Sequence, residues 1–498
     1  MRYISTRGQS PPVTVATALL SGLAPDGGLY LPEIFPAVPE NLFPAVPRLD
    51  YPELAGSILR LFLAGYTQTE LTACLAKAYG PNFDTPAITP LTMVGENLGF
   101  LELWHGPTSA FKDLALQLLP HLLTVAAEKE EQKTEIVLLV ATSGDTGKAA
   151  LEGFKDVPGT KVIVFFPEDG VSAVQKRQMV TQEGENTFVV GVRGNFDQAQ
   201  AGVKALLAAE DFRREMAAAG KRFSSANSIN WGRLVPQVVY YFKAWGELLR
   251  QQVLKPGETF NVVVPTGNFG NILAAYYGKK LGLPVQTLIC ASNRNNVLTD
   301  FIRTGEYNRN RRFYQTISPS MDILVSSNLE RLLYELVGED PRRVAAYMKQ
   351  LQETGSYRLT AAERARLQED FWAGFATEAE TTNAIKEVYE EYHYLIDPHT
   401  AVGYKVYRDY LASTGDARPA VIAATASPFK FNRGVATALF GEENVNETDE
   451  FALMEKLAAA TGVPVPAGLA ALKKKPVRHG RVITPAAMAE TVRAILGI

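Results

Sequence analysis

The sequence predicts an α/β protein in which parallel sheets are covered by helices on both faces. The main observation is that short, continuously apolar runs alternate along the chain with stretches of helical periodicity. Central strands of a parallel sheet are buried on both faces, so they appear in a sequence as unbroken apolar runs. A length of 498 residues, with 46% hydrophobic and 21% charged residues, allows a large core and about three domains.

Residues 1–85 are predicted to form a small leading domain, because they are rich in proline and turn signals. Their helical periodicity is confined to residues 51–64 and 68–79. The apolar stretch at residues 11–24 faintly imitates a signal peptide, but it lacks a clear cleavage site and runs into a turn. We therefore expect no targeting signal there.

The sheets are predicted from apolar runs at residues 136–140, 162–166, 188–192, 260–264, 285–291 and 421–425. The helical stretches among them are residues 148–154, 172–181, 197–219, 231–254 and 271–281. Residues 320–395 look mainly helical and highly charged, and we expect them to form a helical excursion on the surface.

Composition excludes several classes of function. With 50 Lys and Arg against 53 Asp and Glu, the net charge is -3, so no overall basic field would attract nucleic acid or an anionic membrane. No segment is long and apolar enough to span a membrane. Cys74 and Cys290 lie far apart and have no metal or redox spacing, which is typical of reduced thiols in a cytoplasmic protein. An anionic ligand would need a local site.

Lys112 is the first candidate for chemistry, in the run His105-Gly106-Pro107-Thr108-Ser109-Ala110-Phe111-Lys112-Asp113. Thr108 or Ser109 is a natural N-cap, which would put Lys112 in the first turn of a helix. The positive end of the helix dipole would lower the lysine pKa and favour the neutral amine that forms a Schiff base with a carbonyl. The alternative is an exposed lysine near the start of a helix.

A glycine-rich loop directly follows the strand predicted at residues 260–264. Its glycines let backbone amides approach a ligand, and the next helix contributes a positive N-terminus, so the loop is a candidate phosphate cradle. It is not a dinucleotide-binding fingerprint, and a plain turn between strand and helix is the alternative. The loop consists of Gly267, Asn268, Phe269, Gly270 and Asn271.

Two further candidates also follow strands. The loop at residues 141–148 lacks the first glycine and the Ser or Thr of a nucleotide-triphosphate loop. Its hydroxyls and free amides suit a small anion such as a carboxylate, although a capped turn is the alternative. At the end of the strand predicted at residues 421–425, the Thr425 hydroxyl could bond a heterocyclic nitrogen, or it could simply be a cap.

In this order, the motifs closely resemble the threonine synthase family. Phe111-Lys112-Asp113 resembles its cofactor-lysine motif, Ser143-Gly144-Asp145-Thr146-Gly147 its substrate-carboxylate loop, and Gly267 to Asn271 its cofactor-phosphate loop. Further matches extend the likeness across nearly the whole chain and point to the bacterial and fungal branch, which has its own N-terminal domain. They are Tyr3 to Gly8, Asp26 to Tyr30, Asn227 to Arg233 and Asp397 to Gly403.

The resemblance implies a pyridoxal-phosphate enzyme of fold type II, which is similar to tryptophan synthase β. Its architecture would be two open parallel-sheet domains plus a small N-terminal domain. We expect a large cofactor-binding domain at residues 86–134 and 236–445, a small mobile domain at 135–235 and a C-terminal segment at 446–498. The expected protein is a cytoplasmic monomer or homodimer.

The implied reaction converts O-phospho-L-homoserine and water to L-threonine and phosphate. Lys112 would hold the cofactor and then move protons, while Thr425 would face the pyridine nitrogen. The substrate carboxylate is assigned to residues Ser143, Gly144, Asp145 and Thr146, and the substrate phosphate to Arg233 and Lys430. A threonine or serine dehydratase and a non-catalytic binding protein of the same fold are the alternatives.

One position departs from the family pattern. Members of this branch often read Thr-Ala-His-Pro-Ala-Lys-Phe near the end, whereas this chain has Ser427 at the place of the histidine. Thr425 and Lys430 are present at the matching positions. We therefore carry over no role of that histidine to this chain.

Overall fold

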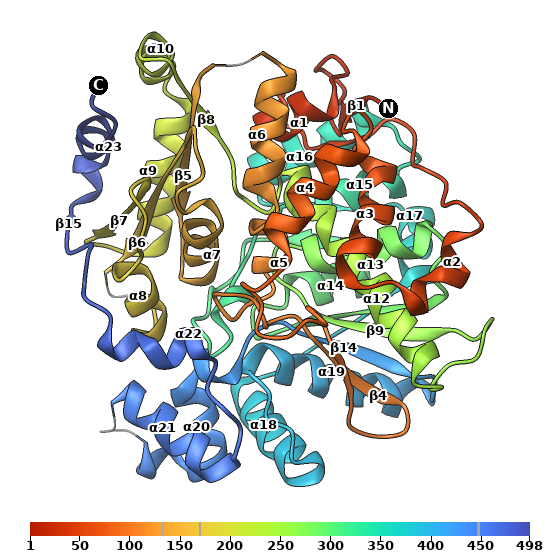
Figure 1. Cartoon of the computed structure of the whole chain (residues 1–498). Helices are drawn as coiled ribbons and strands as arrows, with labels where there is room; N and C mark the ends of the chain where they lie inside the picture. The colour runs from red at the N-terminus through yellow and green to blue at the C-terminus, as the bar shows by residue number, and fades with distance from the viewer. Residues whose placement is uncertain (132, 169–170, 446–448) are drawn as a thin grey trace.

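The computed structural model describes residues 1–131, 133–168, 171–445 and 449–498. Two sheets lie in separate parts of the molecule, the smaller one with its helices to the left in Figure 1 and the larger one to the right. The predicted α/β class is confirmed, with every strand pair of the central sheets parallel except one. No helix among the described residues is long and apolar enough to cross a bilayer.

The larger sheet has six strands in the order β13-β10-β9-β14-β4-β3, and β3 is antiparallel to β4. Neighbouring residues of β9 belong to different hydrophobic clusters, since Val262 and Val264 pack on one face and Val263 on the other. This alternation explains why the run is continuously apolar in the sequence. The strands are β3 (Leu91–Met93), β4 (Leu98–Glu102), β9 (Phe260–Pro265), β10 (Val285–Ser292), β13 (Phe371–Phe375) and β14 (Ala420–Ala424).

Helices cover both faces of the larger sheet. The hydrophobic cluster on one face, which continues to the smaller sheet, includes residues of α5 (Asp113–Leu116), α6 (Leu119–Lys129), α11 (Trp231–Leu234), α12 (Pro236–Arg250), α13 (Gly270–Lys280) and α14 (Val297–Thr304). The other face lies under α18 (Glu378–Tyr392), α19 (Pro398–Thr414), α20 (Asn432–Phe440) and α21 (Glu450–Thr461). The helix expected at 231–254 is divided at Val235, because Pro236 cannot donate the backbone bond that would continue α11.

The smaller sheet is entirely parallel, with strand order β15-β7-β6-β5-β8. The helix expected at 197–219 is two helices that meet at Ala209, whose backbone is extended. The strands are β5 (Glu135–Ala141), β6 (Thr160–Pro167), β7 (Thr187–Val192), β8 (Lys221–Ser224) and β15 (Val482–Ile483). The helices are α7 (Asp145–Phe154), α8 (Ala173–Val180), α9 (Phe196–Ala208) and α10 (Glu210–Ala218).

The N-terminal segment shares its core with the larger sheet rather than forming a core of its own. The cluster that contains Leu54, Ile58 and Phe62 also contains the helix residues Val238 and Val239. The buried Arg331 guanidinium donates to Tyr30 O at 2.8 and 3.0 Å. The segment comprises β1 (Tyr3–Ser5), α1 (Val15–Ser21), β2 (Tyr30–Pro32), α2 (Leu42–Ala45), α3 (Tyr51–Phe62) and α4 (Gln68–Ala78).

The segment expected as a helical excursion is mainly helical, but it also contributes a strand to the larger sheet. Strand β13 pairs in parallel with β10 and forms the edge of the sheet. The expectation of a purely surface helical segment is therefore wrong at residues 371–375, where Phe371 and Ala373 are buried. The helices are α15 (Leu329–Leu336), α16 (Pro341–Thr354), α17 (Ala361–Asp370) and α18. Strands β11 (Glu306–Asn308) and β12 (Ser356–Arg358) pair as a separate antiparallel sheet of two strands.

The C-terminal segment connects the two parts of the molecule. It runs from α20 and α21 through α22 (Ala467–Ala470) to α23 (Met488–Leu496), which lies beside the smaller sheet (Figure 1). Strand β15 pairs in parallel with β7. The Arg177 side chain of α8 donates to the carbonyls of Leu472 and Lys475 at 3.0 and 2.6 Å. The boundaries expected for the domains stay predictions.

Candidate active site

The candidate residues converge where the strands of the larger sheet end. Phe111 N donates to Thr425 O at 2.8 Å, and Ser427 N donates to Ser109 O at 3.1 Å. These bonds join the segment after β4 to the segment after β14, two strands that are neighbours in the sheet. Lys112 therefore lies at the carboxyl edge of a parallel sheet, where ligands bind in open α/β folds.

The local structure around Lys112 differs from the sequence expectation. Helix α5 begins at Asp113, and Lys112 is its N-cap residue rather than part of its first turn. Thr108 does not cap the helix, because its amide and hydroxyl both donate to the Asp113 carboxylate, at 2.8 and 2.7 Å. Ser109 is not the cap either, since it adopts a left-handed conformation with φ of 58°. The predicted N-cap is therefore wrong.

Lys112 is 9% exposed, and its Nζ lies 3.5 Å from Asp145 Oδ2 and 3.4 Å from Ser320 Oγ. Burial is the main cause that lowers the pKa of Lys112, to about 8, and Asp145 partly opposes it. The charges of Lys430 and Arg233 lower this pKa further. The expected direction of the shift is confirmed, but a helix of four residues has too short a dipole to be its cause.

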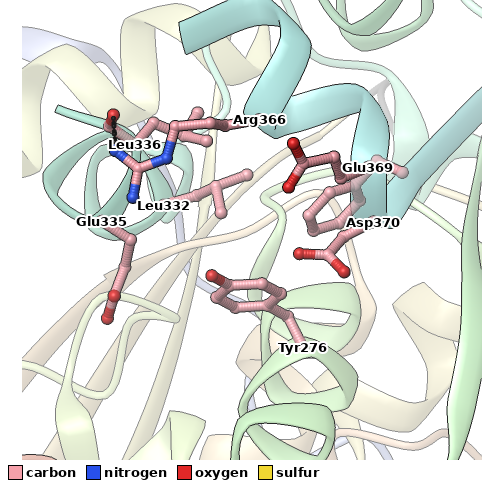
Figure 2. A pocket seen from close by; sticks show the side chains of 8 residues that line it. Tyr276, Leu332, Glu335, Leu336, Arg366, Glu369 and Asp370 are labelled. Carbon is pink, nitrogen blue, oxygen red and sulfur yellow. Dashed lines mark hydrogen bonds between the residues drawn. The ribbon is translucent and has the colours of Figure 1, made fainter. Parts of the chain in front are cut away.

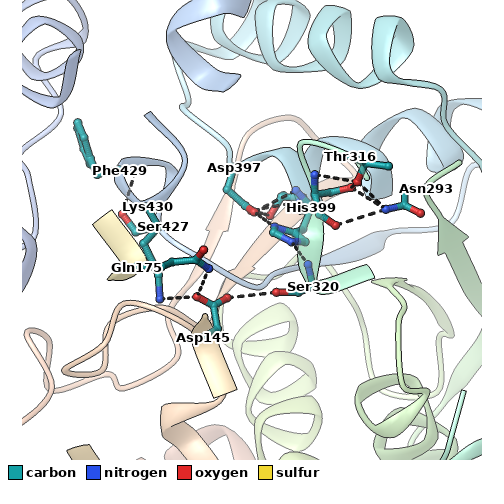
Figure 3. Close-up of polar contacts among 12 residues, drawn as sticks. Asp145, Gln175, Asn293, Thr316, Ser320, Asp397, His399, Ser427, Phe429 and Lys430 are labelled. Atoms are coloured by element: carbon teal, nitrogen blue, oxygen red, sulfur yellow. Dashed lines mark hydrogen bonds and ion pairs between the residues drawn. The ribbon is translucent and has the colours of Figure 1, made fainter. Parts of the chain in front are cut away.

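The Asp145 carboxylate is the centre of a buried polar cluster (Figure 3). It lies 2.8 Å from Lys430 Nζ and accepts hydrogen bonds from Gln175 Nε2 at 2.9 Å and Ser320 Oγ at 3.2 Å. Burial alone would raise its pKa, but the Lys430 and Lys112 ammonium groups hold the pKa of Asp145 well below its usual range. Asp145 comes from the smaller sheet's helix α7 and Lys430 follows β14 of the larger sheet, so this ion pair connects the two sheets.

The loop before α7 is organised by a residue that the sequence analysis did not single out. The Thr142 hydroxyl accepts hydrogen bonds from Gly144 N at 3.0 Å and Gly147 N at 2.9 Å, so these two amides are not free for a ligand. Gly144 has φ of 138°, and a Cβ there would lie 2.4 Å from the Gln175 amide group. Ser143 and Thr146 are half-buried on this loop.

The expected phosphate cradle lies between β9 and α13. Phe269 adopts a left-handed conformation with φ of 62°, which turns the chain into the helix that begins at Gly270. A Cβ at Gly267 would lie 2.7 Å from Ser320 O, so the backbone approaches this segment closely. Asn268 O accepts hydrogen bonds from the backbone and side-chain nitrogens of Asn328, both at 3.1 Å.

The side-chain amide of Asn271 has one atom bonded to the protein and one without a hydrogen-bond partner among the described residues. Its Oδ1 accepts hydrogen bonds from the hydroxyls of Tyr240 and Tyr241, which fixes the orientation of the amide. Its Nδ2 is buried and has no partner among the described residues. An unpaired buried donor beside the N-terminus of an 11-residue helix fits a phosphate group. The residues present therefore fit a phosphorylated cofactor.

Two more buried cations, Lys430 and Arg233, lie near Lys112. The Lys430 side chain is fully buried and also donates to Thr108 O at 2.9 Å. Arg233 is 3% exposed, and its guanidinium donates to Ala226 O at 2.8 Å, while its Nε has no partner among the described residues. Burial lowers the pKa of Arg233 to about 10.

Thr425 and Ser427 lie in the segment that pairs with the residues before Lys112. Thr425 is 6% exposed at the end of β14. Ser427, which stands where the family often has histidine, is buried and accepts a hydrogen bond from Phe429 N at 3.4 Å. In this chain it caps the short 3₁₀ turn that carries Lys430.

Sequence reasoning missed Gln175, Ser320 and His399. Ser320 comes from the charged helical region and carries no motif around it, so no local signal pointed to it. His399 belongs to a run that resembles the family, but that run suggested no chemical role. Ser320 N donates to His399 Nε2 at 3.2 Å (Figure 3).

A separate cavity of about 150 Å³ lies near the far end of α13, and none of the predicted site residues lines it (Figure 2). Its polar lining consists of Glu335, Arg366, Glu369 and Asp370 around the Tyr276 ring. No group of three or more metal-ligating side chains occurs in the described parts of the chain.

Comparison with known proteins places these features in a family. Residues 2–79 match the family described as threonine synthase N terminus, residues 83–367 the pyridoxal-phosphate dependent enzymes, and residues 400–495 the threonine synthase C-terminal family. The Pseudomonas aeruginosa threonine synthase is 40% identical over 443 residues, which cover 89% of this chain and 91% of that protein. Pyridoxal phosphate is therefore confirmed as the cofactor.

Threonine synthase-like 1 of Homo sapiens is 41% identical over 441 residues, or 86% of this chain and 58% of that protein. The chain thus spans about three-fifths of the length of the threonine synthase-like 1 proteins that it matches. The crystal structure of threonine synthase from Brucella melitensis, solved with PLP bound, is 36% identical and superposes with a TM-score of 0.88 over 100% of both chains. The chain belongs to the threonine synthase family.

Proposed function

We propose that this protein converts O-phospho-L-homoserine and water to L-threonine and phosphate. The observation that supports this most strongly is the charge of the buried site. Lys430 and Arg233 both act electrostatically on Lys112 there, whereas Asp145 is the one carboxylate that forms an ion pair with any of the three among the described residues. A site with this excess of positive charge favours an anionic substrate.

The residues that would hold the cofactor are Lys112, Thr425 and the loop from Gly267 to Asn271. When bound, pyridoxal phosphate supplies an electron sink for negative charge that develops on the substrate. The unpaired Asn271 amide and the N-terminus of α13 support the assignment of its phosphate to the loop. A neutral Thr425 hydroxyl would bond the pyridine nitrogen without holding it protonated as a carboxylate would.

The substrate has two anionic groups, and we assign them to different sides of the site. The substrate carboxylate is assigned to the loop from Ser143 to Thr146, through its hydroxyls and its backbone amides other than that of Gly144, which donates to Thr142. The Asp145 side chain has the same negative charge as this carboxylate, so Asp145 would bind it through its backbone only. The substrate phosphate is assigned to Arg233, whose unpaired Nε supports the role, and to Lys430.

Lys112 is the residue that would move protons at the α and β carbons of the substrate. Its burial keeps water away, and a pKa of about 8 leaves a substantial neutral fraction near neutral pH. Phosphate would leave from the γ carbon and water would add at the β carbon, so atoms balance between phosphohomoserine and threonine. A monomeric or homodimeric state and a cytoplasmic location stay predictions from the sequence.

Steady-state assays of the cofactor-loaded protein test this function. Wild type should release one phosphate per threonine from O-phospho-L-homoserine, and Arg233→Met should raise KM at least about tenfold because a charged hydrogen bond to phosphate is lost. A threonine or serine dehydratase would instead form a 2-oxo acid from the free amino acid, and Arg233→Met would leave its kinetics unchanged. That second pattern would refute the proposal.

A further inference from the structure

Ser320 lies at the point where three parts of the site meet. Its hydroxyl lies between Lys112 Nζ, at 3.4 Å, and Asp145 Oδ2, at 3.2 Å. Since the ammonium can only donate and the carboxylate can only accept, the hydroxyl accepts from Lys112 and donates to Asp145. Its carbonyl oxygen packs against Gly267 of the phosphate loop. One residue thus contacts the reactive amine, its counter-ion and the expected cofactor cradle.

The position of Ser320 depends on a buried histidine. Ser320 N donates to His399 Nε2, so this nitrogen carries no proton and the ring is neutral. The other ring nitrogen, Nδ1, then carries the proton and donates to Asp397 Oδ2 at 2.6 Å. His399 is 3% exposed and Asp397 is fully buried, so both partners are held away from water.

Capping of α19 does not explain why His399 points at Ser320. Asp397 is the N-cap of that helix and accepts hydrogen bonds from the backbone amides of His399 and Thr400, at 3.0 and 3.1 Å. Those bonds complete the cap without any use of the imidazole. The His399 Nε2 atom is directed instead to a segment that is distant in sequence, across the carboxyl edge of the sheet.

The residues on both sides of Ser320 are also fixed by hydrogen bonds. The Asn293 side chain, which follows β10, donates to Ser318 Oγ at 3.0 Å and to Asp322 Oδ1 at 2.8 Å. Asp322 in turn accepts from Thr316 N at 3.0 Å. The short turn that carries Ser320 is therefore bonded at both ends, and its hydroxyl has little freedom to leave Lys112.

We propose that Ser320, held in place by His399 and Asp397, is a positioning residue that directs the Lys112 amine for proton transfer. This inference rests on the proposed function, which assigns proton transfer to Lys112. The hydroxyl would keep the amine aimed at the substrate and keep Asp145 from closing onto it. His399 would act through Ser320 and not touch the substrate itself.

The test uses the cofactor-loaded protein and two readouts, kcat with KM and the pH titration of the visible absorption of the bound cofactor. Ser320→Ala should lower kcat about tenfold or more with less than a twofold change in KM. The midpoint of the titration should move to lower pH, because the Lys112 nitrogen loses a hydrogen-bond acceptor for its protonated form. His399→Phe should shift both readouts in the same direction.

Conservative variants separate positioning from mere folding. Ser320→Thr keeps the hydroxyl, and His399→Gln keeps an oxygen that can accept from Ser320 N, so both should recover most of kcat and the wild-type midpoint. Ser57→Ala removes a remote hydroxyl of α3 that donates to Glu53 O and should change neither readout.

Two results would overturn the inference. One is a Ser320→Ala protein with wild-type kcat and midpoint, and the other is equal loss in His399→Phe and His399→Gln. If wild type binds the cofactor but does not consume O-phospho-L-homoserine, the proposed function fails, while the titration midpoints still decide whether Ser320 acts on Lys112. The two failures are therefore distinguishable.

Discussion

Asp145→Asn should destabilise the protein although the change removes only one charge. The Asp145 carboxylate balances Lys430 at 2.8 Å and Lys112 at 3.5 Å, and all three residues are buried. Removing one member of a buried ion pair costs about 3–5 kcal/mol. The asparagine oxygen can still accept from Lys430, so we expect a loss of about 3 kcal/mol in the free energy of unfolding.

The pH dependence has a definite sign. The pKa of Asp145 lies below that of an unfolded aspartate, so its stabilising contribution is complete above about pH 4 and is lost as the pH falls through the folded value. The contribution of the carboxylate itself should therefore be the same at pH 7 and pH 5, and any larger deficit of the variant at pH 5 would come from protonation of the buried Lys112. In the variant the pKa of Lys112 should fall below about 8, because Asp145 opposes the lowering caused by burial.

Urea unfolding of wild type and variant at both pH values measures the loss. Asp211→Asn is the matched control, because Asp211 pairs with Arg214 on the surface, where its side chain is 96% exposed, and should cost less than about 0.5 kcal/mol. Inorganic phosphate should stabilise Asp145→Asn more than wild type, since the anion can replace the missing charge. A variant within about 1 kcal/mol of wild type would refute the electrostatic reasoning.

Two other predictions follow from the same site. The rate at which the cofactor-free protein captures pyridoxal phosphate should rise about tenfold per pH unit below pH 8 and level off above it, because the neutral Lys112 amine is the form that reacts. A rate that continues to rise up to about pH 10 would indicate a lysine of ordinary pKa. Gly267→Ala should weaken cofactor binding at least about tenfold in a spectrophotometric titration, because the new Cβ would lie 2.7 Å from Ser320 O. An unchanged affinity would mean that the loop does not hold the cofactor.

Most strands that are buried on both faces were predictable, but β4 was missed although all five of its residues are buried. The run at β9 is unbroken because its side chains alternate between two hydrophobic clusters. Strand β13 was missed because its five residues lie among charged helices and form an edge of the sheet. Strand β8 begins with Lys221 and Arg222, two half-buried residues at another sheet edge, and also lacks an apolar run. Local patterns do not reveal strands whose burial comes from distant elements.

The site was predictable where a strand meets a helix and a motif marks the loop. The capping of Lys112 was predicted wrongly because Asp113 takes the donors of Thr108, a competition that the spacing alone does not show. Ser320 could not be found, since it is 208 residues from Lys112 in the sequence and reaches it through the packing of another segment. The contact between Ser320 and Lys112 is tertiary, so no local sequence pattern reveals it.

The central claim is that Lys112 holds pyridoxal phosphate in a site that consumes O-phospho-L-homoserine. The most direct measurement compares wild type and Lys112→Ala for the visible absorption of bound cofactor and for phosphate released with threonine. Wild type should show both, and Lys112→Ala should lack the lysine-dependent absorption and release no phosphate. A wild-type protein that stays colourless with added pyridoxal phosphate, or a Lys112→Ala protein that still forms threonine, would contradict the account.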